Sequence, residues 1–205
     1  MDKKSDIFHS KNYLILNFII LLGYIILYPA ITNKLDPTKF GNYILAYTVA
    51  TIIVAISNLG IKEAYKRNFF EFYKNKKDTE ILLFTVQIFI LFISFFVILL
   101  NVFYEEKIIF YFKELNQIKY SWLMLLIAIM LESFSKIYLI FLQNNKKSQT
   151  YFLIIFSKNI LYFFVVFYFL FYDYALASLI YSLLISNIFL FLMVMISQLK
   201  NNYFS

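Results

Sequence analysis

Six long runs of apolar residues constrain this chain more than any other feature of its sequence. They cover residues 13–31, 43–61, 81–103, 120–143, 151–172 and 175–197. At 1.5 Å per residue, even the shortest run forms a helix of about 28 Å, enough to cross the core of a bilayer. With 62% hydrophobic residues and a mean hydropathy of +0.73, the chain has more apolar surface than a soluble domain of this size can bury. The sequence therefore predicts an all-α, polytopic membrane protein, a single bundle of six transmembrane helices within residues 1–205.

The first run favours an uncleaved membrane anchor over a cleaved signal peptide. It is long for the apolar region of a signal peptide, and no small-x-small cleavage site follows it. Asn17 and Gly23 lie inside the run. Pro29 lies near its far end, where the loss of one backbone hydrogen bond is easier to tolerate. We expect this run to be the first membrane-spanning helix.

The positive charges are unequally distributed between the two sides of the predicted bundle. If the N-terminus is cytoplasmic, the inner segments hold twelve Lys and Arg residues and the outer segments hold five. Two more lie within helices, which accounts for all 19. Six of the inner charges fall in residues 62–77, and the five outer ones are Lys34, Lys39, Lys107, Lys113 and Lys119. This excess predicts that both termini face the cytoplasm.

Two connections are longer than turns. Residues 62–80 mix lysines with the aromatic residues Phe69, Phe70, Phe72 and Tyr73. This mixture is typical of an inner-leaflet segment whose rings sit at headgroup depth while its cations meet anionic lipid. We prefer that interpretation to specific substrate contact. Residues 104–119 have a similar mixture on the outer side.

The stretch from residue 35 to residue 67 carries two of the three glycines and one of the two prolines. A polar turn precedes the second apolar run, and a Leu-Gly step after it opens a basic segment. This pattern of turn residues around an apolar run resembles the second helix of the oligosaccharide flippases, the polysaccharide transporters of the multidrug/oligosaccharidyl-lipid/polysaccharide superfamily. The matching residues are Pro37, Phe40, Gly41, Tyr43, Leu59, Gly60 and Arg67. The family commonly has acidic residues before the Phe, where this chain has Thr38 and Lys39.

Three ionisable residues lie within the fourth and fifth predicted helices. Lys136 follows Glu132 at a spacing of four, and Lys158 lies in the next helix beside Asn159. The loop between the helices is centred on Lys147. Because Lys136 and Lys158 are each eleven residues from Lys147, antiparallel helices would place them at similar depth. Ionisable groups at such depth usually face a bundle interior or a wet cavity, so these four residues are candidates for substrate binding.

The charge of this predicted layer suits an anionic ligand. One carboxylate and two ammonium groups give a net charge of +1, which is the right sign for a diphosphate. The alternative is structural: an internal Glu132–Lys136 pair at a favourable spacing, with Lys158 extending to the inner headgroups.

The resemblance implies a flippase that exports a polyprenyl-diphosphate-linked oligosaccharide across the cytoplasmic membrane for surface polysaccharide biosynthesis. In that family, two six-helix bundles alternate between inward-open and outward-open shapes around a cationic cavity. We therefore expect a half or truncated transporter that pairs with a second six-helix bundle or with itself. We expect no enzymatic activity, cofactor, metal ion or nucleic-acid partner, and the sequence has no phosphate loop, metal-ligand pattern or nucleophile elbow.

Two alternatives remain. A membrane enzyme of polysaccharide assembly, such as a polymerase or glycosyltransferase, would also be basic and polytopic. Such enzymes usually have a large outer loop or acidic residues near a membrane face, and the longest outer segment here, residues 104–119, is short and mixes its acidic groups with lysines. The chain could also be a membrane partner that does not itself transport.

Overall fold

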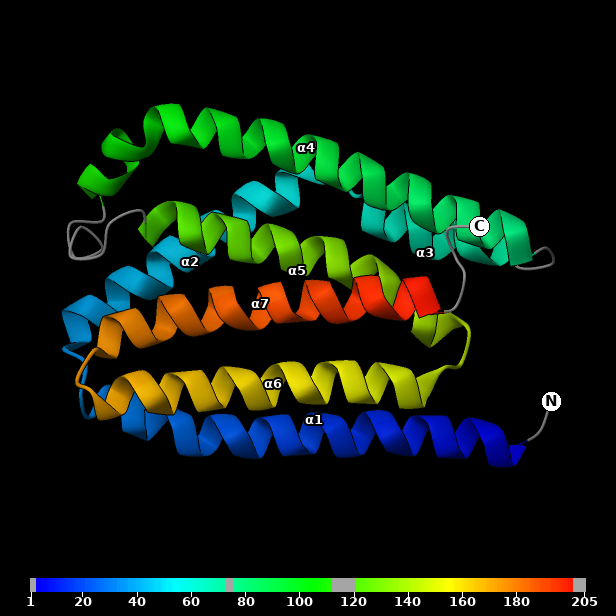
Figure 1. The fold of residues 1–205 in the computed structure, drawn as a ribbon, viewed down its shortest axis with the longest axis horizontal. Coiled ribbons are helices and arrows are strands. Elements are labelled where there is room, and N and C mark those ends of the chain that lie inside the picture. The colour runs from blue at the N-terminus through cyan, green and yellow to red at the C-terminus, as the bar shows by residue number, and fades with distance from the viewer. Residues whose placement is uncertain (1–2, 73–75, 112–120, 201–205) are drawn as a thin grey trace.

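The protein is a bundle of helices. The computed structural model describes residues 3–72, 76–111 and 121–200 (Figure 1). The helices are α1 (Lys3–Thr32), α2 (Pro37–Ser57), α3 (Ile61–Phe72), α4 (Lys76–Tyr111), α5 (Ser121–Asn144), α6 (Ser148–Phe171) and α7 (Ala175–Lys200). Within the described residues, six helices are long and apolar enough to cross a membrane, and α3 is not among them. The predicted all-α, six-helix membrane bundle is confirmed.

Helix α5 is the centre of the bundle. It packs against α4 and α7 along its length and also against α2, while α6 lies beyond α7 and α1 lies at the edge on α6 (Figure 1). In the apolar part of α5, 72% of the residues are buried, compared with 17% in α1. The exposed apolar side chains of the outer helices suit contact with lipid, and the helical backbone satisfies its own hydrogen bonds there.

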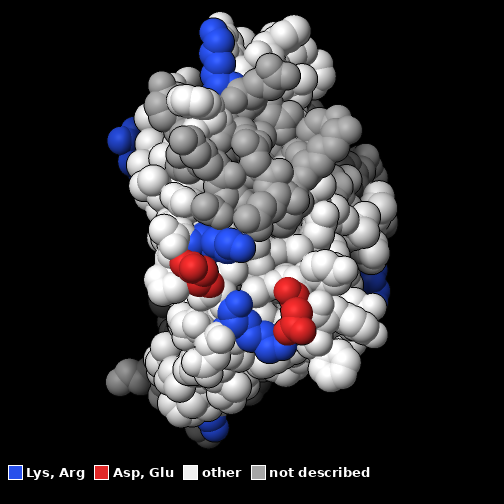
Figure 2. Space-filling view, turned by 90° about the vertical axis from the view of Figure 1, so that its left-hand side faces the viewer, with Lys and Arg blue, Asp and Glu red and all other residues white. Residues whose placement is uncertain are grey.

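The bundle has two distinct ends. One end, called here the α3 end, holds α3, the start of α1, the α5–α6 connection and the end of α7 (Figure 1). The α1–α2 and α6–α7 connections meet at the opposite end. Figure 2 shows this opposite end, where uncharged side chains predominate; the red side chains lie beside blue ones near the middle of the view, and further blue side chains lie at its edges. Lys34 and Asp173 form an ion pair at 2.6 Å that joins the two connections.

Helix α2 begins earlier than the sequence predicted. Asp36 caps its N-terminus by accepting a hydrogen bond from the Thr38 N–H at 2.8 Å. Pro37 stands at the first helical position, where a missing N–H costs no intrahelical hydrogen bond. The Thr38 hydroxyl and N–H also lower the pKa of the Asp36 carboxyl by stabilising its charged form. The predicted start at residue 43 was wrong, because the predicted polar turn forms the first turn of the helix.

Helix α2 also ends earlier than predicted. Leu59 (φ +47°) and Gly60 (φ +69°) both adopt the left-handed region of backbone space, which breaks the helix after Ser57. The chain then resumes as α3. The predicted end at residue 61 was wrong because the Leu-Gly step itself terminates the helix.

Helix α3 occupies much of the connection that the sequence assigned to the membrane surface. Phe69 is fully buried, and its ring meets Phe141 of α5 edge-on with centroids 6.1 Å apart. The Phe69 ring therefore packs on protein and not on lipid, and its depth relative to the headgroups stays a prediction. Phe70 and Phe72 are exposed, and Tyr73 lies outside the described residues.

The predicted spans of α5, α6 and α7 agree with the helices to within about one turn, whereas α1 begins at Lys3 instead of residue 13 and α4 is longer at both ends. Its 36 residues correspond to about 54 Å, which exceeds the thickness of a bilayer core. Residues 104–111 of the predicted outer connection are therefore helical, and residues 112–119 lie outside the described part of the chain.

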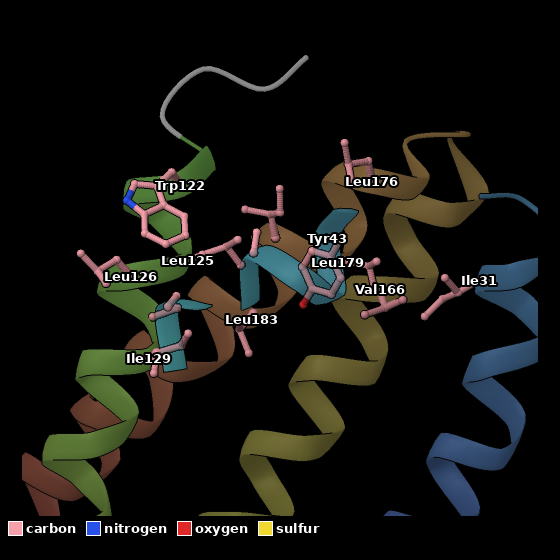
Figure 3. Packing of buried hydrophobic residues seen from close by; sticks show 14 of the residues in the cluster. Ile31, Tyr43, Trp122, Leu125, Leu126, Ile129, Val166, Leu176, Leu179 and Leu183 are labelled. Carbon is pink, nitrogen blue, oxygen red and sulfur yellow. The ribbon is translucent and has the colours of Figure 1, made fainter. Parts of the chain in front are cut away.

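Two apolar clusters fill the bundle. One lies toward the opposite end and contains Trp122 and Leu126 of α5, packed against residues of α2, α6 and α7 (Figure 3). The other lies toward the α3 end and contains Phe69 and Phe141. Residues 131–133 of α5 belong to neither cluster. This gap between the clusters is where the polar side chains gather.

Candidate functional site in the middle of the bundle

A layer of polar side chains separates the two apolar clusters. Helix α5 contributes Glu132 and Ser133, α6 contributes Lys158, and α7 contributes Ser186 and Asn187. Ser186 and Asn187 are fully buried. Within the described residues, neither polar atom of the Asn187 amide has a hydrogen-bond partner. Because apolar packing lies on both sides, this layer is in the middle of the bundle.

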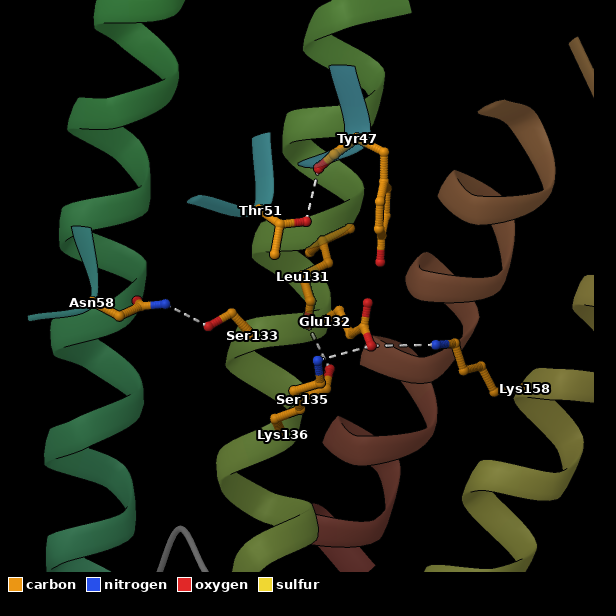
Figure 4. A network of polar contacts seen from close by, with 9 residues as sticks. All are labelled: Tyr47, Thr51, Asn58, Leu131, Glu132, Ser133, Ser135, Lys136 and Lys158. Atoms are coloured by element: carbon orange, nitrogen blue, oxygen red, sulfur yellow. Dashed lines mark hydrogen bonds and ion pairs between the residues drawn. The ribbon is translucent and has the colours of Figure 1, made fainter. Parts of the chain in front are cut away.

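Glu132 holds lysines from two different helices (Figure 4). Its Oε1 lies 3.1 Å from Nζ of Lys136, one turn later on α5, and 3.7 Å from Nζ of Lys158 on α6. The side chains of Glu132 and Lys158 are 18% and 16% exposed, whereas that of Lys136 is 48% exposed. Two cations thus share one carboxylate. This ion cluster carries a net positive charge, and Lys136 is its most accessible member.

The position of Lys158 contradicts the structural alternative in part. Its ammonium group points from α6 toward Glu132 (Figure 4) and does not extend to headgroups at the end of the bundle. The Glu132–Lys136 half of that alternative is present, at the favourable spacing of four. The shared depth of the two lysines, predicted from their distance to the loop, is confirmed by their contact with one carboxylate.

Polar groups of α2 border the ion cluster. The Asn58 side-chain amide at the end of α2 donates a hydrogen bond to the Ser133 hydroxyl at 2.8 Å. Thr51 donates to the Tyr47 carbonyl at 2.8 Å, and the Tyr47 hydroxyl points toward Glu132 (Figure 4). The Asn58–Ser133 hydrogen bond links the end of α2 to the part of α5 that carries the carboxylate.

A cavity of about 240 Å³ extends from the ion cluster toward the α3 end. Its charged lining residues are Lys62, Lys66, Glu132, Lys136 and Lys158, and we call it the cationic pocket. Burial, together with the neighbouring Lys136 and Lys66, lowers the pKa of the Lys62 ammonium. Lys66 has its own partner, Glu63, at 3.1 Å. The four lysines facing one carboxylate give the pocket an excess of positive charge that an anion would relieve.

The sequence interpretation missed Lys62 and Lys66 as site residues. It assigned the whole segment to lipid contact, because basic and aromatic residues alternate there. The available signal was helical spacing: Lys62 and Lys66 are four apart, as are Tyr65 and Phe69, and the two aromatic side chains are buried. An amphipathic helix packed by Tyr65 and Phe69 on the bundle carries its lysines to the edge of the cavity.

Asn159, the fourth predicted site residue, stands outside the ion cluster. Its amide donates to the Ile155 carbonyl at 2.8 Å, and its side chain lines a second cavity of about 160 Å³ together with Lys158. This cavity lies among α1, α2, α6 and α7. It is lined by Tyr24, Tyr28, Tyr43, Tyr47 and Tyr162, and we call it the tyrosine pocket. Lys158 is therefore the side chain shared by the two cavities.

The residues that carry the family resemblance shape α2 and the turn after it. Of these, Phe40 and Tyr43 line the tyrosine pocket, and Arg67 is exposed on α3. Gly41 has open space around it, since a Cβ added there would meet no atom within 4 Å. The ion pairs of the cluster join Glu132, Lys136 and Lys158, none of which belongs to the motif, so the motif and the cluster are separate observations.

The ion cluster has the composition of an anion site. Among the described residues that line the cationic pocket, Glu132 is the one carboxylate. In the part of the chain that the structure describes, no three His, Cys, Asp or Glu side chains stand close enough together to hold a metal ion. Lysine ammonium groups are therefore the cations that this pocket offers to a ligand, beside the polar side chains of Gln143 and Tyr151.

Comparisons with protein-family models, with curated proteins and with solved structures find no match to this chain. Its function is therefore inferred from the geometry of the two cavities and from the short motif in α2.

Proposed function

We propose that this chain takes part in moving a polyprenyl-diphosphate-linked oligosaccharide across the cytoplasmic membrane for the assembly of a surface polysaccharide. The observation that carries the proposal is the ion cluster. Lys158 and Lys136 share Glu132 in the middle of an apolar bundle, beside a cavity with two further lysines. Charged groups at such depth are costly, and they commonly mark a substrate path.

The chemistry of the substrate fits this arrangement. A diphosphate between a polyprenyl tail and a sugar chain cannot enter hydrocarbon without compensation for its charge. The cationic pocket offers Lys136 as an accessible cation, while Glu132 holds Lys158 beside it. An arriving diphosphate would compete with Glu132 for the two ammonium groups. The residues we assign to substrate binding are Lys136 and Lys158, with Glu132 as the group that positions them.

We place the α3 end in the cytoplasm. The excess of Lys and Arg in the segments assigned to that side supports this orientation. Both termini of the described chain lie at that end of the bundle (Figure 1). The cationic pocket then faces the cytoplasm, the side from which the proposed substrate would enter.

We also propose a second bundle as partner, either another six-helix bundle or a second copy of this chain. Alternating access requires two bodies that rock against one another around a site near the middle of the membrane. A single bundle supplies one wall of such a site. The half-exposed Lys136 suits a position on that wall.

The test is transport by proteoliposomes that contain this chain and its partner, with a fluorescent polyprenyl-diphosphate oligosaccharide as substrate. Lys136→Gln and Lys158→Gln should abolish transport and leave membrane insertion intact, because removing a buried cation makes insertion more favourable. Lys136→Arg should keep partial activity, since the charge remains and the hydrogen-bond geometry differs. Lys200→Gln, an exposed lysine at the end of α7, is the matched control.

A double variant separates transport from simple charge pairing. If the cluster were only structural, Glu132→Gln combined with Lys136→Gln would be better tolerated than either single change, because each single change leaves an unpaired buried charge. Full transport by Lys158→Gln, together with recovery in this double variant, would refute the proposal.

A further inference from the structure

Two pairs of tyrosines line the same cavity from consecutive helices. Tyr24 and Tyr28 are one turn apart on α1, with stacked rings whose centroids are 5.7 Å apart. Tyr43 and Tyr47 are one turn apart on α2, stacked at 6.3 Å. Tyr162 of α6 joins them, with its ring centroid 6.1 Å from that of Tyr24. The spacing of four brings each pair to one face of its helix, and all five rings border the tyrosine pocket.

These tyrosines differ from tyrosines that seat a protein in the membrane interface. Interface tyrosines face outward, as Tyr168 of α6 and Tyr172 directly after that helix do at 53% and 55% exposure. In the pocket Tyr43 is only 6% exposed and Tyr24, Tyr47 and Tyr162 are partly buried, whereas Tyr28 is 52% exposed. Rings that turn inward around an open cavity are available to a ligand.

The lining of this pocket defines the class of ligand that would fit. Tyrosine offers an apolar ring face and a phenol group that both donates and accepts hydrogen bonds. Asn159 adds an amide, and among the described lining residues Lys158, at the border with the cationic pocket, is the one that carries a charge. Pockets of this kind, with aromatic walls and a few placed polar groups, bind small organic groups in a fixed orientation. A sugar ring has the matching surfaces, with C–H bonds on its faces and hydroxyl groups around its edge.

We propose that the tyrosine pocket is a subsite for the sugar residue attached to the diphosphate. The proposal rests on the proposed function, since it places the diphosphate at Lys158 and the next group of the same substrate on the other side of that residue. An acyl or polyprenyl chain would gain little from the phenol groups and the Asn159 amide. The cavity volume of about 160 Å³ suits one ring-shaped group and leaves the rest of the sugar chain outside.

Binding of two probes by the purified full chain in lipid nanodiscs tests this subsite. One probe is a polyprenyl diphosphate, and the other is the same lipid diphosphate carrying a single N-acetylhexosamine. Tyr24→Phe and Tyr28→Phe remove one phenol group each and keep the ring packing. Each should weaken binding of the sugar-bearing probe by about threefold to tenfold, the effect of one lost hydrogen bond, and leave the bare diphosphate unchanged. Tyr168→Phe, on the outward face of α6, is the matched control and should change neither Kd.

The two proposals fail in different ways. Lys158→Gln should weaken both probes, because both carry the diphosphate. If the two probes have equal Kd values for the wild-type chain and for the tyrosine variants, the sugar subsite is wrong and the diphosphate site stands. If the tyrosine variants weaken both probes equally, the pocket holds the lipid tail and the subsite is again wrong. If neither probe binds, the proposed function is wrong and the subsite is wrong with it.

Discussion

Helices α1 and α5 are both long apolar helices, yet they differ in how much of their surface is buried and in how many helices they contact. α5 packs against five other helices, and 72% of its apolar part is buried. α1 packs mainly on α6 at the edge of the bundle, and only 17% of its apolar part is buried. One sequence pattern thus serves both a protein core and a surface suited to lipid.

The difference determines which helix can carry charge. Between Tyr13 and Thr32, α1 has no ionisable Lys, Arg, Asp or Glu side chain, because a charge there would face hydrocarbon. α5 carries Glu132 and Lys136 at its middle, where α6 supplies a further cation at 3.7 Å. Enclosure by other helices allows the pairing partners to come from several directions. The charged layer belongs to the helix that has neighbours on every side.

The largest expected effect comes from matched leucine truncations in the two helices. Leu126→Ala in α5 removes a side chain that is fully buried and should cost about 2–5 kcal/mol of unfolding free energy, since the cavity left behind cannot close fully. Leu21→Ala in α1, where the side chain is 57% exposed, should cost less than about 0.5 kcal/mol because lipid or detergent fills the space. Unfolding in mixed micelles followed by circular dichroism gives both values. Similar losses for the two variants would show that α5 is not enclosed as described.

A smaller difference in stability is expected between alanine substitutions at two glycines, one in each of the first two helices. A Cβ added to Gly23 of α1 would lie 2.3 Å from ring carbons of Phe163 on α6, a ring held by Tyr24 at a centroid distance of 5.4 Å. Gly23→Ala should therefore destabilise the protein by about 1–3 kcal/mol through overpacking. Gly41→Ala in α2 meets no atom and should stabilise by roughly 0.5–1 kcal/mol, because alanine loses less backbone entropy in a helix.

The direction in which each glycine variant shifts the thermal midpoint tests how α1 is attached to the bundle. Thermal midpoints in detergent should fall for the Gly23 variant and rise for the Gly41 variant. An unchanged midpoint for Gly23→Ala would mean that α1 and α6 can separate at this point without loss, and that the edge helix is held elsewhere.

The sequence predicted the six spans because length and apolar content are local properties of a segment. It did not predict which helix is central, because α1 and α5 are both long and apolar, and the charged residues of α5 do not specify which helices pack around them. The ion cluster was predictable, since a spacing of four and equal distances from a short loop fix the relative depth of Glu132, Lys136 and Lys158. The sequence did not predict where the Lys158 side chain points, because the rotation of α6 about its own axis is set by the helices packed against it.

The tyrosine pocket and the lysines of α3 were missed for a different reason. The chain has 18 tyrosines and 19 basic residues, so a few of either kind carry little information by position alone. The Tyr24–Tyr28 and Tyr43–Tyr47 spacings gain meaning only when the two helices are seen to border one cavity. The early start of α2 was a local signal that the sequence did contain, because Asp36 followed by Pro37 is typical of a helix N-terminus.

The smallest expected effect concerns the link between α1 and α2. Asp36 is exposed, and hydrogen bonds from Thr38 lower the pKa of its carboxyl. A carboxyl whose pKa is lower in the folded state stabilises the fold above its unfolded pKa of about 3.9, and that contribution is lost as the pH falls through the folded pKa. Asp36→Asn keeps a side-chain oxygen that can cap α2 and does not titrate. The thermal midpoint of the wild type should therefore fall relative to that of Asp36→Asn as the pH is lowered from 5 to about 2. Parallel midpoints over this range would mean that the charge of the Asp36 cap does not stabilise this end of α2.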